Sequence, residues 1–334
     1  MAWPNCYQGT QKQFYKGATE DVSRVAEAIS AFQPVRLLVN KSRVSEARQR
    51  FNALPGVSIV PVRDYRYMDL WMRDIAPTMA SHDRQLVGVD FNFNGWGNKV
   101  PYVKNFASDI LEILNIPRVF STLRAEGGGI EADGEGTLIL TESAILNKNR
   151  NKGKSKQQVE EELRRTLGAE KIFWVTGRKG LDITDCHIDC LARFIAPAKV
   201  VLSRPIPEDD FFKCYKQARD ILASARDARG REIELFELPE ARVENLGLSK
   251  SILDLIDRDD DYDFCLSYAN FLFVNGGIVL AQFGDAQADA AAIEILRALC
   301  PDRKIIPVLI NTLPILGGGI HCATQEVPLI RPLV

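Results

Sequence analysis

The sequence lacks any long apolar run and any strong excess of charge of one sign. No stretch approaches the roughly 20 apolar residues of a spanning helix, and the N-terminus lacks the basic-then-apolar arrangement of a signal peptide. Lys and Arg total 42 against 44 Asp and Glu, so the formal charge of -2 gives no electrostatic reason to expect nucleic acid or an anionic membrane as a partner. We therefore expect a cytoplasmic protein that acts on a small molecule.

Cysteines in CxxC spacing are also absent. The seven cysteines are an odd number scattered along the chain, so neither a disulfide framework nor a structural zinc site is indicated. Hydrophobic residues make up 46% and charged residues 26% of the 334 residues, which allows a substantial core without covalent or metal cross-links. At least one thiol is therefore available for chemistry.

A strand, helix, strand pattern recurs five times in the hydrophobic periodicity. The expected strand pairs are 35–39 with 57–62, 86–89 with 119–120, 137–140 with 172–175, 200–202 with 233–235, and 278–280 with 305–308. We expect Thr19 to cap the first helix, Ser155 to start and Gly168 to end the helix of the third unit, and a helix over 208–226 in the fourth.

Repeated α/β units can form an open doubly wound sheet or close into a ring. Polar, glycine-rich segments fall at one phase of the repeat, at 71–77, 126–134, 184–189 and 317–322. If the units are related by rotation, segments of equal phase meet near the common axis. This coincidence favours closure into a single α/β domain over 1–334, with five pseudo-symmetric units around a central site.

Cys322 follows three consecutive glycines at 317–319, which permit backbone conformations that are barred to other residues. The thiol is then exposed and preorganised for reaction, or else it is a small buried hydrophobe, as most free cysteines are. The other six cysteines lack a glycine loop, so we expect them in the core.

The densest polar cluster is the segment 184–190, TDCHIDC. If the segment is extended, alternate side chains place His187 and Asp189 on one face and the cysteines on the opposite, buried face. A carboxylate and an imidazole on one face can share a ligand, one holding positive charge and the other moving a proton. The alternative is a structural histidine. His321 is the weaker candidate for a base, since its side chain and that of its neighbour Cys322 diverge.

Carboxylates accompany two further segments. Asp74 lies in WMRD at 71–74, where an ion pair with Arg73 is the structural alternative, and Glu126 precedes the glycines at 127–129. These glycines do not form a phosphate loop, because the required Lys-Ser/Thr is missing. The acids that follow, Glu131, Asp133 and Glu135, form a turn, a cation site or a solvated face. The basic run Lys148, Arg150, Lys152, Lys154 and Lys156 is most simply a solvated loop.

A thiol, an imidazole and the three carboxylates of Asp74, Glu126 and Asp189 remain, with no basic cluster in the set. Acidic residues around a nucleophile suit a small cationic substrate. A guanidinium is planar, and its fork of donors matches carboxylates two at a time, which leaves the central carbon open to attack.

The chain resembles the agmatine deiminases, relatives of the bacterial-type peptidylarginine deiminases in the guanidino-group-modifying superfamily. The resemblance is carried by WMRDIAPTM at 71–79, EGGGIEADGEGT at 126–137 with LNKNRN at 146–151, TDCHIDCLARF at 184–194, SYANFLFVN at 267–275 with FGDAQAD at 283–289, and GGGIHCATQEVP at 317–328. It spans most of the chain. It implies the family's fold, a five-bladed α/β propeller (pentein) of repeated units.

The resemblance also implies roles for individual residues. Cys322 is the nucleophile, His187 the general acid and base, and Asp74, Glu126 and Asp189 bind the guanidinium, so that agmatine is converted to N-carbamoylputrescine and ammonia through a covalent thiouronium adduct. Further substrate contacts are expected from Trp71, Trp96, Asn270 and Gly319, although the two tryptophans suit a core equally well. No metal or organic cofactor is needed, and a homo-oligomer in putrescine synthesis is consistent with the family.

The sequence departs from the family pattern at three places. Cys186 replaces the usual glycine of TDGH, and Glu131 stands where many members have histidine. The chain begins at MAWPN, without a leading segment that carries Trp, Glu and His, so we expect either a weakened closure of the ring or an unpaired edge strand in the first unit.

Three other functions stay open. One is a peptidylarginine or other guanidine deiminase, and another is a catalytically silent guanidine-binding relative. The third is a metal-dependent hydrolase that uses Glu126, Asp133, His187 and Asp189, although no HExxH or comparable spacing exists.

Overall fold

The computed structural model describes residues 1–5, 11–246, 248 and 264–329, and Cys6 lies outside them. The chain divides into two compact units, which we describe separately. Unit 1 holds Met1–Trp71 and Leu238–Thr324, and unit 2 holds Met72–Glu237 and the residues from Gln325 onward. The expectation of one domain over 1–334 stays a prediction. None of the helices that the structure describes has the length and apolar content needed to cross a bilayer.

Unit 1 contains a two-stranded and a three-stranded sheet. The first sheet pairs β1 (Val35–Asn40) with β2 (Val57–Val62) in parallel, and the second orders β12 (Leu272–Val274), β13 (Gly277–Gln282) and β14 (Lys304–Leu309). Its helices are α1 (Gln11–Ser30), α2 (Val44–Phe51) and α11 (Ala286–Leu299), with short 3-10 turns at η1 (Lys41–Arg43) and η4 (Val243–Asn245). Helix α1 contacts strands of both sheets.

Unit 2 contains three sheets of three strands each. Their strands are β3 (Thr78–His82), β4 (Gln85–Asp90) and β5 (Arg118–Phe120); β6 (Ile130–Ala132), β7 (Thr137–Thr141) and β8 (Lys171–Val175); and β9 (Ala192–Ala196), β10 (Lys199–Arg204) and β11 (Glu234–Pro239). The helical segments are α3 (Met72–Ile75), α4 (Gly95–Asn98), α5 (Phe106–Leu114), η2 (Gly127–Gly129), α6 (Glu142–Ile145), α7 (Lys148–Asn151), α8 (Lys156–Leu167), η3 (Ile188–Cys190) and α9 (Phe212–Leu222).

The five repeated units predicted from hydrophobic spacing are therefore present as five small sheets. In the three sheets that begin with β3, β6 and β12, an antiparallel strand precedes the predicted strand, helix, parallel strand unit. The sequence patterns did not reveal this added strand, which is only three residues long in β6 and β12 and five in β3.

The first sheet has one edge paired. The backbone N–H of Trp3 donates to the carbonyl of Leu38 over 2.9 Å, and the N–H of Leu38 donates to the carbonyl of Met1 over 2.9 Å. Residues 1–3 thus run along the edge of β1, whereas β1 is the one partner strand of β2 among the described residues. The expectation of an unpaired edge strand is therefore wrong for β1 and holds for β2. A covered edge cannot pair with another chain.

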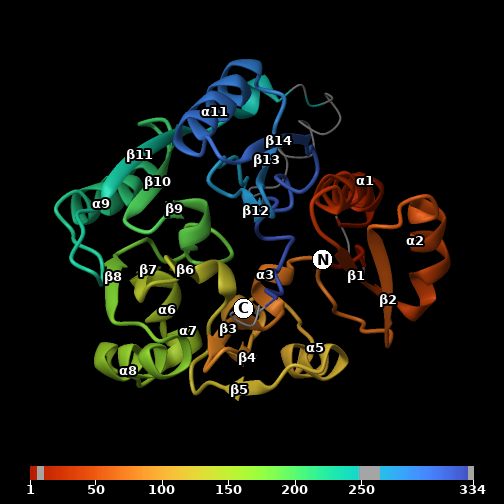
Figure 1. Cartoon of the computed structure of the whole chain (residues 1–334), viewed down its shortest axis with the longest axis horizontal. Coiled ribbons are helices and arrows are strands. Elements are labelled where there is room, and N and C mark those ends of the chain that lie inside the picture. Colours follow the sequence, from red (N-terminus) through yellow and green to blue (C-terminus); the bar gives the residue numbers. More distant parts are fainter. Residues whose placement is uncertain (6–10, 247, 249–263, 330–334) are drawn as a thin grey trace. The chain divides into compact units, whose positions relative to one another are not determined.

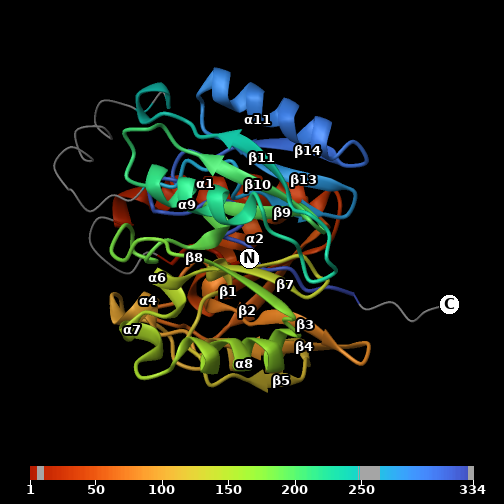
Figure 2. The same ribbon diagram turned by 90° about the vertical axis from the view of Figure 1, so that its left-hand side faces the viewer.

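The longer helices of unit 2 pack their apolar sides on the strands. In α8, Val159 and Leu163 are four residues apart and belong to one buried cluster with Leu138 and Leu140 of β7. Both elements are labelled in Figure 1. Helix α9 packs on β10 and also contacts β8 (Figure 2). Burying each such side chain contributes about 1.5–3 kcal/mol, which makes these sheets rigid supports for the loops at their ends.

Two of the predicted helix boundaries are right and two are wrong. Ser155 forms a capping box at the start of α8, and Gly168 ends that helix with a φ of 68°. Helix α1 begins well before Thr19, whose hydroxyl donates to the carbonyl of Tyr15 inside the helix instead of capping it. Helix α9 covers only Phe212–Leu222, because the acidic residues before it form a turn.

Candidate active site

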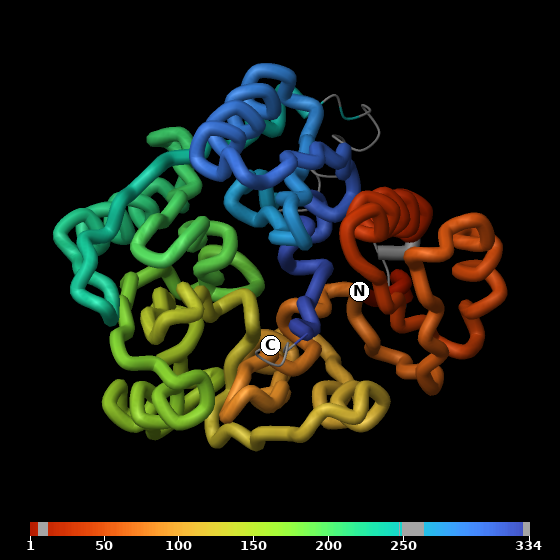
Figure 3. Tube along the Cα trace, viewed as in Figure 1, coloured from red at the N-terminus to blue at the C-terminus, as the bar shows by residue number. Residues whose placement is uncertain are grey.

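Three short segments meet in unit 2 at the ends of its sheets. Helix α3 carries Asp74, the residue before η2 is Glu126, and His187 and Asp189 belong to the turn that forms η3. Both α3 and η3 contact η2, and Figure 3 shows the course of the chain through this unit in orange, yellow and green. Segments more than 50 residues apart in sequence thereby present four functional side chains to one another.

The imidazole of His187 lies between two carboxylates. Its Nδ1 is 3.7 Å from Oδ1 of Asp74, and its Nε2 is 3.4 Å from Oε2 of Glu126. A Cβ atom on Gly128 would lie 2.7 Å from Nδ1 of His187, 2.8 Å from Oδ1 of Asp74 and 3.1 Å from Oδ2 of Asp189. The four predicted residues of this unit are therefore together, and only a glycine at 128 leaves room between them.

Burial and mutual charge perturb the protonation of this cluster. Burial lowers the pKa of His187, but the nearby carboxylates of Asp74, Glu126 and Asp189 outweigh it and raise that pKa to about 9. Burial raises the pKa of Asp74 to about 6, although His187 opposes this shift. At neutral pH the cluster therefore holds an imidazolium among carboxylates, an arrangement that can give up a proton when another cation enters.

Arg150 is a member of the site that the sequence reasoning missed. Its side chain is fully buried, and its Nε donates to both carboxylate oxygens of Glu126 over 2.9 and 2.8 Å. The prediction that the basic run around it is a solvated loop is wrong for this residue, because the single helical turn of α7 directs it inward. The one signal that could have found it is the asparagine-rich context LNKNRN, which differs from the lysine-rich stretch that follows.

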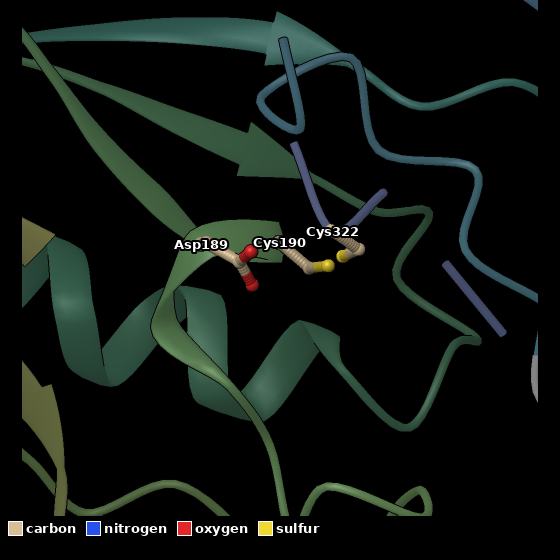
Figure 4. A group of neighbouring side chains, drawn as sticks. All are labelled: Asp189, Cys190 and Cys322. Atoms are coloured by element: carbon tan, nitrogen blue, oxygen red, sulfur yellow. The ribbon is translucent and has the colours of Figure 1, made fainter. Parts of the chain in front are cut away.

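The segment 184–190 is not extended, so the predicted alternation of faces is wrong. Asp185 and Cys186 have φ values of 64° and 72°, and η3 follows directly. His187 and Asp189 meet because of this turn. Cys190, the last residue of η3, lies next to Asp189 (Figure 4) and is only half-buried. A left-handed φ costs a non-glycine residue about 1–2 kcal/mol, which explains why glycine suits position 186 better than cysteine.

Asp74 is held by donors at both oxygens. The indole Nε1 of Trp96 donates to Oδ2 over 2.9 Å, and the backbone N–H of Gly128 donates to Oδ1 over 2.9 Å. Trp96 itself is buried and adopts a φ of 51°. Arg73 pairs with Glu326 at 2.6 Å, and the structural alternative of an Arg73–Asp74 ion pair stays a prediction.

The acids after η2 belong to the fold. Glu131 is buried, accepts the N–H of Phe194 over 2.8 Å and pairs with Nε of Arg193 at 2.9 Å. Oδ1 of Asp133 accepts the backbone N–H groups of Glu135 and Thr137. Of the three alternatives given for these acids, a turn is therefore the one that applies to Asp133. Among the described residues, Asp133 does not join Glu126, His187 and Asp189 in a group of metal-ligand atoms.

The thiol candidate lies in unit 1. Cys322 is partly exposed at the end of the glycine loop (Figure 4). The amide Nδ2 of Asn270 donates to its Sγ over 3.2 Å, and Oδ1 of Asn270 accepts the backbone N–H groups of His321 and Cys322 over 3.0 and 3.3 Å. A donor aimed at the sulfur stabilises negative charge on it.

The glycines before Cys322 allow this arrangement. A Cβ atom on Gly319 would lie 2.5 Å from Oδ1 of Asn270, and one on Gly318 would lie 2.4 Å from the ring of Trp71. Trp71 therefore packs its buried ring on the glycine loop, and Gly319 lets the Asn270 amide approach the thiol. Their substrate contacts stay predictions.

The chain is similar in sequence and in fold to known guanidine-modifying enzymes. The family of Porphyromonas-type peptidyl-arginine deiminases matches residues 1–328. An agmatine deiminase of Pseudomonas putida is 33% identical over 91% of this chain and 85% of its own length, and one of Pseudomonas syringae pv. tomato is 35% identical over the same shares. The solved agmatine deiminase of Enterococcus faecalis covers 97% of this chain and 91% of its own, with 29% identity and a TM-score of 0.84. The predicted fold class, an α/β pentein of five repeated units, is confirmed by these likenesses and by the five sheets.

Proposed function

This chain belongs to the family of Porphyromonas-type peptidyl-arginine deiminases, and from this membership we propose that it hydrolyses agmatine to N-carbamoylputrescine and ammonia. The observation that carries the proposal is the position of His187 between Asp74 and Glu126, with Asp189 beside the same glycine. A buried group of three carboxylates around one imidazole attracts a planar cation and supplies a proton donor next to it.

In this proposal the guanidinium is held by Asp74 and Asp189. Oδ1 of Asp74 and Oδ2 of Asp189 lie within 3.1 Å of the point where a Cβ on Gly128 would stand. Both oxygens of Glu126 accept from Nε of Arg150, and Oε2 also lies 3.4 Å from Nε2 of His187. Two carboxylates on one side of the planar group orient it and leave its central carbon open. We therefore assign Glu126 chiefly to holding His187.

The reaction then proceeds in two stages. His187, which gives up its proton when the guanidinium binds, takes the thiol proton of Cys322 as Sγ attacks the guanidinium carbon and forms a C–S bond. His187 then passes this proton to the nitrogen that leaves as ammonia when the C–N bond breaks. Water next attacks the thiouronium carbon and gives a proton to His187, and the C–S bond breaks to release the ureido product and restore the thiol. The sum is agmatine plus water giving N-carbamoylputrescine plus ammonia, and no step needs a metal or an organic cofactor.

A substrate panel tests the proposal. We expect purified protein to release ammonia and a ureido product from agmatine much faster than from free arginine, a peptide with C-terminal arginine or methylated arginine. The family description favours an arginine-bearing peptide as the second candidate. If only the peptide is turned over, the substrate is peptidylarginine and not agmatine. If none of the four compounds is turned over, the chain is a catalytically silent guanidine-binding relative.

Substrate binding is expected to release protons. A guanidinium beside His187 and Asp74 disfavours their protonated forms, whose pKa values are about 9 and about 6 in the free site, so both pKa values fall on binding. Calorimetric titration of Cys322→Ala protein with agmatine, at pH 7.5 in buffers of different ionisation enthalpy, should show release of about 0.5–1 proton per site. The same titration of a Cys322→Ala, His187→Asn double variant serves as the control and should show far less. Proton uptake by the single variant would contradict this reading of the site.

A cytoplasmic location, a part in putrescine and polyamine synthesis, and a homo-oligomeric state are further parts of the proposal. They follow from the sequence and the family resemblance. Sedimentation of the purified chain would test the oligomeric state directly.

A further inference from the structure

We propose that Arg150 is a positioning residue, which keeps Glu126 ionised and oriented so that Glu126 can hold the imidazole of His187 during turnover. This inference rests on the proposed function, because it assigns a role to Arg150 in the same reaction. It concerns a residue that touches neither the substrate nor the reacting atoms.

The contacts of Arg150 use its whole guanidinium. Nε donates to both oxygens of Glu126, Nη1 donates to Oδ2 of Asp185 over 2.7 Å and to Oδ1 of Asn149 over 3.2 Å, and Nη2 donates to the carbonyl of Thr184 over 3.0 Å. The partners come from three separate segments. A fork of fixed geometry can hold all of them at once, whereas the single ammonium of a lysine cannot.

Asp185 anchors the far end of this arrangement. Besides Arg150, it accepts the N–H of Gly180 over 2.8 Å and pairs with Nζ of Lys99 at 3.0 Å. Asp185 also belongs, with Cys186, to the left-handed turn that leads into His187. Arg150 therefore ties the turn that carries His187 to the carboxylate that contacts the His187 ring.

Charge balance explains why a cation is needed at this position. The charged groups that act on Glu126 and its partner imidazole are Arg150, His187, Asp74 and Asp189. Buried carboxylates near one another resist ionising together, and burial by itself raises the pKa of Glu126, while Arg150 and His187 bring it below its ordinary value. Without Arg150, His187 would be the main counter-charge, and it must change protonation twice in each turnover.

The test compares Arg150→Lys and Arg150→Met with matched changes at Arg165. Arg165 also pairs with a glutamate in unit 2, through Nε and Nη2 to Glu162 over 2.8 and 2.7 Å, but at the surface and apart from the site. We expect Arg150→Lys to lower kcat about 10-fold and Arg150→Met about 100-fold, with KM within about threefold of the parent value. In Arg165→Lys and Arg165→Met, kcat and KM should both stay at the parent values.

The pH profile separates positioning from general damage to the fold. In Arg150→Met the acid limb of kcat should move upward by about one pH unit or more, because Glu126 then takes up a proton in the working range. Arg150→Lys retains the positive charge and should keep the parent profile. A parent-like kcat in Arg150→Lys, or a rise in KM as large as the fall in kcat, would overturn the proposal. If Arg150→Met does not fold, the Arg150→Lys constants decide alone.

Imidazole NMR gives a readout that does not depend on turnover. The chain has three histidines, so the resonance of His187 can be assigned with His187→Asn protein. The parent and Arg150→Lys should show the steps of His187 itself and of the nearby Asp74, whose pKa values are about 9 and about 6, and Arg150→Met should add a further acid-side step as Glu126 protonates. Absence of the added step in Arg150→Met counts against Arg150, whereas a parent protein that turns over no guanidine, with the added step present in the variant, counts against the proposed function only.

Discussion

Cys322→Ala is expected to abolish ammonia release from agmatine, with a loss in kcat of at least about 10,000-fold. The reason is that alanine offers no sulfur to form the C–S bond, while the carboxylates of unit 2 that attract the cation remain. Binding of agmatine should therefore persist in the variant, as calorimetry would show. The proposed nucleophile and the proposed guanidinium site lie in different segments of the chain, so one change separates chemistry from binding.

Cys300→Ala is the matched control for this experiment. Cys300 is a buried thiol of the same unit, located directly after α11, and its pKa is raised by burial, which disfavours the reactive thiolate. We expect its removal to leave kcat close to the parent value. An acid-quenched reaction of the parent should carry the mass of the adduct on the peptide that contains Cys322. Turnover by Cys322→Ala within tenfold of the parent would refute its role as the nucleophile.

His187→Asn is expected to lower kcat by about 100- to 10,000-fold, the range that a general acid and base contributes. Asparagine can hydrogen-bond to Asp74 and Glu126. However, it cannot pass a proton to the nitrogen that leaves as ammonia, and it cannot accept a proton from the attacking water. The measurement is steady-state turnover of agmatine across pH. His82→Asn provides the control, because that imidazole is highly exposed at a turn and should be dispensable. A variant with more than a tenth of parent activity would exclude His187 as the acid and base.

The same histidine links stability to pH. The pKa of His187 is about 9 in the folded chain and about 6.5 when unfolded, so the imidazolium is favoured by the fold. Its stabilising contribution is fully present below pH 6.5 and is lost as pH rises through 9. The difference in free energy of unfolding between parent and His187→Asn should accordingly shrink above pH 9, as denaturant titrations would show.

The sequence predicted most of the repeated architecture and which four ionisable side chains meet within unit 2. Apolar spacing located the strand, helix, strand units, and Ser155 and Gly168 marked the ends of α8. The equal phase of the polar loops indicated a shared site, and unit 2 does bring Asp74, Glu126, His187 and Asp189 together. These predictions succeeded because they depend on neighbours within a few residues or on the symmetry of the repeat.

Other features of the site depend on contacts across the fold. The extended reading of 184–190 failed because the turn at Asp185 and Cys186 is held from outside: the hydroxyls of Ser143 and Thr141 donate to the carbonyls of these two residues over 2.7 Å. No local pattern in TDCHIDC contains that information. The strained φ at Cys186 persists because the surrounding structure supports it.

By itself, the sequence determined the α/β class, the five units and the identity of the four ionisable side chains around Gly128, since hydrophobic period and motif spacing are local properties. Only the tertiary structure decided that Trp96 binds Asp74, that Cys322 is met by Asn270 and that Arg150 is buried. The partners of Arg150 lie 24 and 35 residues away in the chain, at Glu126 and Asp185. A charged side chain is exposed or buried according to the opposite charges that folding brings to it, and that pairing exists only once the segments have packed.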